Sequence, residues 1–226
     1  MQQKSRDMND YEMYFTWYME ELIQHGYLKS YQWEPEKIII LPDYVHKREK
    51  HYKVRPNELE NFTLLPKATY TYDFRMIWNE SAIDIFTNLF DKKSHFPFGI
   101  PTFVSHYVKI NDELEIASYV DIKPHSTAAA FSGSMASYFT FPFVQKILLA
   151  TRGLYINKIV PIPSGKKGIA NCLFNKTFTP NRYKMTDGGG QKRTIKFPTT
   201  PIVSYAKRQR GIIDDLRSKS SQQTLL

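Results

Sequence analysis

Cysteine is almost missing from this chain, because Cys172 is the only one among 226 residues. A single thiol excludes an internal disulfide and a zinc site built from several cysteines. Long apolar runs are missing as well: no stretch reaches the ~20 apolar residues needed to span a bilayer. The opening MQQKSRDMNDYE also lacks the apolar segment of a secretory signal. We therefore expect a cytoplasmic protein with no membrane partner.

Several common catalytic signatures are missing too. The six histidines show no HExxH motif and no paired metal-ligand spacing. Gly165-Lys166-Lys167-Gly168 has neither the spacing nor the hydroxyl residue of a P-loop, and no Gly-x-Ser-x-Gly elbow is present. The sequence therefore gives no support to a zinc peptidase, a P-loop NTPase or a serine hydrolase.

Positive charge, in contrast, is abundant and unevenly placed. Residues 145–226 carry 16 Lys and Arg against 3 Asp and Glu, a net charge of +13, whereas residues 1–144 carry −4. A basic half with interleaved aromatic residues indicates a polyanionic partner, most simply DNA; the alternative is a solvated basic tail. Beyond residue 160 the candidate phosphate contacts are Lys166, Lys167, Lys192, Arg193, Lys207, Arg208 and Arg210.

The apolar pattern predicts an α/β core over residues 1–160, followed by a basic, partly flexible extension over residues 161–226. Residues 43–61 are charged and irregular, which indicates an exposed loop or hairpin. We expect helices at 9–26, 80–90 and 142–151, with a further short helix possible within 202–218. We expect strands at 37–41, 68–78, 104–110, 114–123 and 154–160.

The run from Leu114 to Lys123 is the most informative segment. Strand periodicity places Asp121 and Lys123 on the same face as Tyr119, with Val120 and Ile122 on the other face. The turn signal Asn111-Asp112 predicts a hairpin with the preceding strand. An acid-x-Lys at a strand end presents a carboxylate and an ammonium together, which suits metal-assisted hydrolysis of a phosphodiester.

A second acid is needed to complete a minimal metal site. Asp73 is a charge set among aromatic and aliphatic residues of the 68–78 strand, where an unpaired carboxylate is costly. It is therefore the natural partner of Asp121. Glu115 shares a strand face with Asp121 and is a rival ligand, and His125 follows Lys123 closely enough to lie near the site.

These features together resemble the PD-(D/E)xK, or restriction-endonuclease-like, superfamily. The order is a helix with Glu12, a strand with Asp73, a strand with Asp121-Ile122-Lys123, then a helix and a strand. The chain looks most similar to small phage endonucleases related to Holliday-junction resolvases, through Glu12, Gly26-Tyr27-Leu28 and Gln32. The resemblance implies a central mixed β-sheet flanked by helices, with residues 79–112 as an insertion.

The resemblance also implies site roles and a function. Glu12, Asp73 and Asp121 would bind Mg²⁺ or Mn²⁺, Lys123 would position the attacking water, and Lys146 would approach a substrate phosphate. Glu20 and Glu21 are rivals to Glu12. The implied activity is endonucleolytic cleavage of double-stranded or branched DNA by a homodimer, in the host cytoplasm if a phage encodes it. The alternative is a non-catalytic DNA-binding or structural phage protein.

Overall fold

The central sheet is mixed and six-stranded, and it accounts for the predicted α/β class. A computed structural model of the chain describes residues 8–54, 56, 58–90, 103–123, 135–160, 174, 177, 184–186, 192–194 and 201–223. The strand order is β1-β6-β9-β8-β7, with β10 also paired to β9. The bounds are β1 Leu28–Trp33, β6 Phe74–Trp78, β7 Thr87–Leu89, β8 Phe103–Ile110, β9 Glu113–Ile122 and β10 Ile156–Ile159.

The centre of the sheet is β9, which pairs with three neighbours. It runs antiparallel to β6 along one edge; along the other edge it pairs first with antiparallel β8 and then with parallel β10. Asn157 bridges the point where β8 and β10 diverge along this edge of β9. Its side-chain Nδ2 donates to the carbonyls of Val104 and Tyr119, and its side-chain Oδ1 accepts from the Val104 N–H. The far end of β9 is therefore enclosed by β6 and β10.

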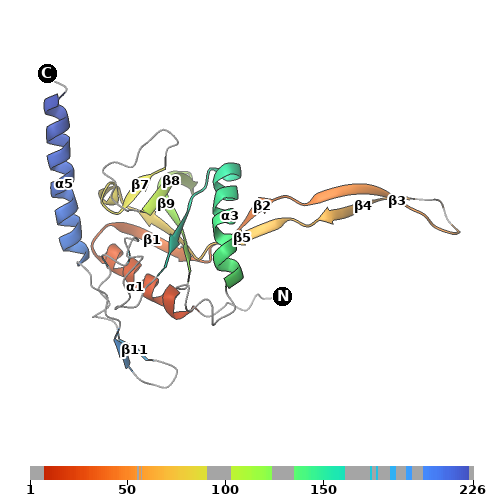
Figure 1. Ribbon diagram of the computed structural model, residues 1–226, viewed down its shortest axis with the longest axis horizontal. Coiled ribbons are helices and arrows are strands. Elements are labelled where there is room, and N and C mark those ends of the chain that lie inside the picture. Colours follow the sequence, from red (N-terminus) through yellow and green to blue (C-terminus); the bar gives the residue numbers. More distant parts are fainter. Residues whose placement is uncertain are drawn as a thin grey trace.

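Helices cover both faces of the sheet (Figure 1). Helix α1 (Asp10–Gln24) begins at an Asn9 capping box and packs Phe15, Tyr18 and Leu22 against Phe74 and other side chains of one face. Helix α3 (Met135–Arg152) lies on the other face, where its buried residues pack against β6, β9 and β10. Two hydrophobic clusters on opposite faces therefore fix the sheet between the two helices.

A long β-hairpin projects from this body (Figure 1). We call residues 37–71 the arm. Its root is the pair β2 (Lys37–Leu41) and β5 (Ala68–Thr71), and its outer part is the pair β3 (Tyr44–Lys50) and β4 (Glu58–Leu65). Every residue of β3 is exposed. The expected loop or hairpin at 43–61 is thus a hairpin, and it is longer than the pattern indicated.

Helix α5 (Ile202–Gln223) extends the predicted 202–218 segment. Its buried Ile202, Tyr205 and Ala206 join the cluster of α1, and the Tyr205 ring lies 5.7 Å from that of Phe86. Part of the C-terminal extension therefore packs on the core. Short strands β11 (Lys184–Thr186) and β12 (Lys192–Thr194) pair with each other.

Two local predictions were wrong. The expected helix at 80–90 is a single 3₁₀ turn, η1 (Glu80–Ala82), followed by β7, because Thr87–Leu89 pair with β8. The expected strand at 68–78 is two strands, since β5 pairs within the arm and β6 within the sheet. Helix α3 also begins earlier than predicted and contains Pro142.

The predicted hairpin of β8 and β9 is present. It turns at Asn111 and Asp112, both with positive φ. None of the helices in the described ranges is long and apolar enough to cross a membrane. Cys172 lies outside the described residues.

Candidate active site at the end of the central strand

Strand β9 carries Asp121 to its buried end with the predicted alternation. Ala117 and Tyr119 belong to the cluster under α3, whereas Val120 and Ile122 belong to the cluster under α1. The side chains of Asp121 and Lys123 therefore face α3. Just past the strand, the Lys123 N–H donates to the carbonyl of Ile159 at 2.8 Å, which extends the pairing with β10.

Asp73 occupies the bend between the arm and the sheet. Its N–H donates to the carbonyl of Val120 at 3.0 Å, and its own carbonyl accepts from Glu34 N–H at 2.7 Å. Its carboxylate Oδ2 accepts from the backbone N–H of Ile122 at 2.6 Å. These bonds place Asp73 directly across from the Asp-x-Lys segment, so the residues at 79–112 do not separate the two acids.

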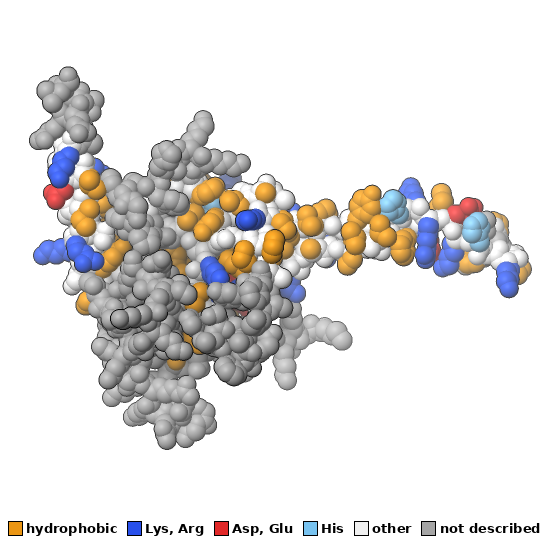
Figure 2. Space-filling model, in the orientation of Figure 1, with side chains coloured by type: hydrophobic (Ala, Val, Ile, Leu, Met, Phe, Trp, Pro, Cys, Tyr) orange, Lys and Arg blue, Asp and Glu red, His pale blue; other side chains and the backbone are white. Residues whose placement is uncertain are grey.

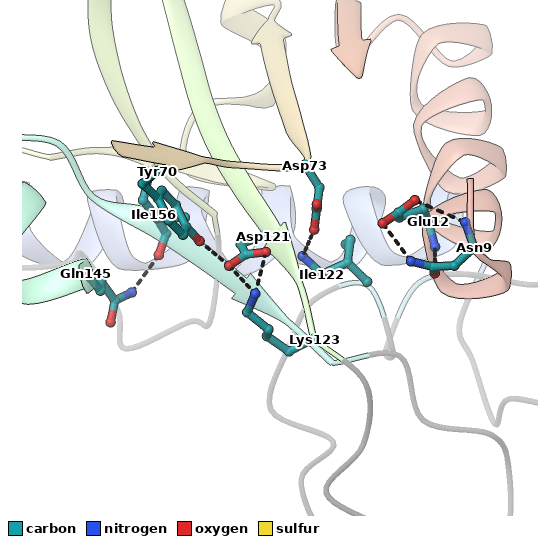
Figure 3. A network of polar contacts seen from close by, with 9 residues as sticks. All are labelled: Asn9, Glu12, Tyr70, Asp73, Asp121, Ile122, Lys123, Gln145 and Ile156. Carbon is teal, nitrogen blue, oxygen red and sulfur yellow. Dashed lines mark hydrogen bonds and ion pairs between the residues drawn. The ribbon is translucent and has the colours of Figure 1, made fainter. Parts of the chain in front are cut away.

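Four polar side chains meet at this point, and we call Tyr70, Asp73, Asp121 and Lys123 the carboxylate site (Figure 3). The Lys123 ammonium contacts Asp121 Oδ1 at 3.0 Å and Oδ2 at 2.7 Å. The Tyr70 hydroxyl donates to Asp121 Oδ2. Asp121 is thus held by one cation and one neutral donor in surroundings where only 3% of its side chain is exposed.

Asp73 is a buried acid that lies beside a second carboxyl group. Burial, the negative charge of Asp121 and a hydrogen bond between the two carboxyls together raise the pKa of Asp73 to about 8, although the Ile122 N–H acts in the opposite direction. A neighbouring carboxylate disfavours the charged form of a buried carboxyl group. A bound divalent cation would relieve that repulsion and favour the ionised form of Asp73.

The donor set fits a hard divalent cation. Mg²⁺ is commonly bound through one or two carboxylates, with waters and substrate phosphate oxygens completing its coordination. Asp73 and Asp121 supply two adjacent carboxylates, and burial followed by the charge of Asp121 raises the pKa of Asp73. Among the described residues, however, no group of three or more His, Cys, Asp or Glu side chains is placed to hold a metal. The described part of the chain thus offers a two-carboxylate site.

Glu12 does not complete that group. It is 1% exposed on α1, and its carboxylate closes the capping box by accepting from the Asn9 backbone N–H at 3.1 Å and from Asn9 Nδ2 at 2.6 Å. Its negative charge still contributes to raising the pKa of Asp73. Glu12 therefore lies close enough to influence the carboxylate site electrostatically. Both of its carboxylate oxygens, however, accept hydrogen bonds that cap its own helix.

The rival acids lie elsewhere. Glu115 forms an ion pair with Lys29 and is six residues from Asp121 on the same strand, about 20 Å along it. Glu20 and Glu21 lie more than two helical turns beyond Glu12 on α1. None of these three joins Asp73 and Asp121.

Two further side chains at the site were not identified from the sequence. Tyr70 comes from the arm root, and Lys158 stands beside Asp121 in the parallel register of β9 and β10. Both lysines approach one ring: the Phe141 centroid lies 5.5 Å from Lys123 Nζ and 5.8 Å from Lys158 Nζ. Only the pairing of the strands brings Tyr70 and Lys158 here, so no local motif could have indicated them.

The predicted phosphate contacts lie in different parts of the chain. Lys146 is exposed on α3, and Lys207, Arg208 and Arg210 are exposed on α5, which lies on the opposite side of the body from the arm (Figure 1). Lys166, Lys167 and His125 lie outside the described residues. The backbone of Lys192 and Arg193 is part of β12, but their side chains are outside the described set.

Comparison with known proteins identifies no relative: no protein-family model, no curated protein and no solved structure matches this chain.

Proposed function

We propose that this chain is a Mg²⁺- or Mn²⁺-dependent endonuclease of the PD-(D/E)xK type that hydrolyses DNA phosphodiester bonds. The observation that carries the proposal is the meeting of Asp73, Asp121 and the Lys123 ammonium at one buried strand end. Two acids and a lysine in contact suit metal-assisted phosphodiester hydrolysis.

The order of elements supports the same proposal. Helix α1, strands β1, β6 and β9, helix α3 and strand β10 follow one another, with the two helices on opposite faces of the sheet. This is the order that the resemblance to restriction-endonuclease-like proteins implies. The arm, together with β7 and β8, accounts for the additional length between the expected elements.

Each residue has a distinct role in the proposed reaction. Asp73 and Asp121 hold the cation, which supplies an activated water and neutralises phosphate charge. Lys123 orients the attacking water and offsets charge on the phosphate, as a buried ammonium can. Lys158, beside Asp121 in register, adds a second ammonium on the same face.

The substrate is a polyanion that matches the charge of the chain. The protein carries a net charge of +9, and exposed Lys207, Arg208 and Arg210 cluster on α5. Binding that relies on phosphate contacts weakens steeply with salt. Branched DNA in phage recombination is the proposed substrate class, and a homodimer is the proposed assembly, because paired strands at a junction are cut symmetrically.

Purified protein incubated with linear, single-stranded and four-way-junction DNA tests the proposal. We expect cleavage with Mg²⁺ or Mn²⁺, none with chelator, and a loss of about 10³-fold in Asp121→Asn and Lys123→Met. The turn of β8 and β9 offers a matched control, because Lys109 and Asp112 form an exposed ion pair at 2.7 Å. Asp112→Asn and Lys109→Met should cut like the unaltered protein.

A non-catalytic DNA-binding protein is the second candidate. It is favoured by one observation: two acids, not three, form the site within the described ranges. Salt-sensitive DNA binding that is retained in Asp121→Asn, with no cutting of any of the three substrates by the unaltered protein, would support this candidate over the nuclease. An absence of DNA affinity at low salt would contradict both.

A further inference from the structure

The arm root contributes a polar group directly to the carboxylate site. Tyr70 lies in β5, where it pairs with Ile38 of β2, and its hydroxyl reaches Asp121 across 51 positions of sequence. Because an ionised carboxylate only accepts hydrogen bonds, the Tyr70 hydroxyl must be the donor. Figure 3 shows it approaching Asp121 from the side opposite Asp73.

The root is held firmly enough to aim this hydroxyl. Ile38 and Tyr70 pack against the cluster under α3, which includes Ile40 and Tyr72. Arg152, at the end of α3, donates from Nη2 to the carbonyl of Ile39 at 3.1 Å. The ring of Tyr70 is thereby fixed between the arm and the sheet, although the outer arm is exposed on both faces.

The bonding of Asp121 indicates what the hydroxyl does. A carboxylate has about four acceptor positions. Lys123 contacts both oxygens, Tyr70 takes a position on Oδ2, and the hydrogen bond with the Asp73 carboxyl takes one more. Tyr70 and Lys123 can therefore stay in place while the position facing Asp73 is used to bind a cation.

We propose that Tyr70 is a positioning residue of this site: its hydroxyl fixes the orientation of Asp121 so that Asp121 and Asp73 present oxygens to one divalent cation. The inference rests on the proposed metal-dependent function, and it makes the arm root a structural part of the site. Burial and the nearby charges of Asp121 and Asp73 raise the pKa of Tyr70 well above its usual range. The hydroxyl therefore remains a donor throughout the working range of pH.

The variant Tyr70→Phe removes only the hydroxyl and tests this role. We expect its dissociation constant for Mn²⁺, measured by titration calorimetry, to rise 10- to 100-fold, which is the usual effect of removing a hydrogen-bond partner of a metal ligand. Cleavage should recover in large part at saturating Mn²⁺. The acid limb of the pH–rate profile should move up by about one pH unit, because the ionised form of the carboxylate pair loses a donor.

Tyr44→Phe is the matched control, since Tyr44 lies on the same hairpin with 54% of the residue exposed. It should bind Mn²⁺ like the unaltered protein, and circular dichroism should show both variants folded. Mn²⁺ affinity and a pH profile in Tyr70→Phe equal to those of Tyr44→Phe would overturn the inference. Weaker Mn²⁺ binding in Tyr70→Phe supports it even if no DNA is cut, which would refute only the nuclease activity. A lack of Mn²⁺ binding by the unaltered protein would overturn both.

Discussion

Two acid–base pairs of this chain have similar chemistry and opposite surroundings. Asp121 and Lys123 at the end of β9 expose 3% and 13% of their side chains, whereas Glu60 and Arg48 on the outer arm expose 30% and 56%. Water screens the arm pair, so its contribution to stability is small. The inner pair is isolated from water and depends on Tyr70 and Asp73 for its remaining contacts.

The surface view reflects the same contrast. Figure 2 shows apolar and charged side chains side by side along the arm, with Lys, Arg, Asp and Glu gathered towards its tip. On the arm the Arg48 guanidinium lies 4.5 Å from the centroid of the exposed Phe62 ring. We therefore expect single substitutions on the arm to have small, independent effects on stability, whereas substitutions in the carboxylate site and the core beside it should affect their neighbours as well.

The largest expected effect is a difference in unfolding free energy between substitutions of two phenylalanines, one in the core and one on the arm. Phe74 is fully buried beside Phe15, with ring centroids 5.4 Å apart, whereas Phe62 is 39% exposed on β4. Phe74→Ala should lower the free energy of unfolding by about 3–5 kcal/mol, because it leaves a cavity in the core. Phe62→Ala should lower it by less than about 1 kcal/mol. Urea unfolding measures both values, and equal losses would contradict the comparison.

Metal should stabilise the site and leave the arm unaffected. At a Mn²⁺ concentration of about 100 times the dissociation constant, one site that binds only the folded protein adds about 2.7 kcal/mol. The rise in thermal midpoint should be larger at pH 8.5 than at pH 6. At pH 6, below the raised pKa of Asp73, the cation must first displace a proton from this carboxyl group. Asp121→Asn should abolish the rise and Asp112→Asn should retain it. A rise in thermal midpoint that does not depend on pH would contradict the raised pKa of Asp73.

The stability of the metal-free protein should depend on pH through Asp73. Its folded-state pKa of about 8 lies above the unfolded value of about 3.9, so the native state binds more protons between these values. This contribution is complete below about pH 4 and is lost as the pH rises through 8. Asp73→Asn should reduce the fall in unfolding free energy between pH 5 and pH 9 by on the order of 4 kcal/mol. Parallel pH curves for the two proteins, measured by urea unfolding with chelator, would exclude this assignment.

The smallest effect is expected on the arm. Arg48 and Lys50 keep the pKa of Glu60 below its usual value by hydrogen bonding and charge, but the group is exposed to water. Glu60→Gln should therefore shift the thermal midpoint by no more than about 1 °C. Differential scanning calorimetry can detect a larger shift, which would show that the arm is coupled to the core.

Sequence patterns predicted much of the core but little of its connectivity. The alternation of β9 and the hairpin turn at Asn111 and Asp112 both follow from local chemistry, and both are present. The helix expected at 80–90 failed because the strand pairing of Thr87–Leu89 overrode a local helical pattern. The single strand expected at 68–78 failed because its two halves pair with different partners.

The sequence by itself determined that Asp121 and Lys123 share a strand face, because the period of a strand is a local property of the backbone. It also determined that Asp73 is an acid in apolar surroundings. Only the tertiary structure decided that Tyr70 donates to Asp121, that Lys158 stands beside it and that Glu12 caps its own helix. These outcomes depend on which distant segments pair, and pairing is set by the burial of whole faces rather than by any short motif.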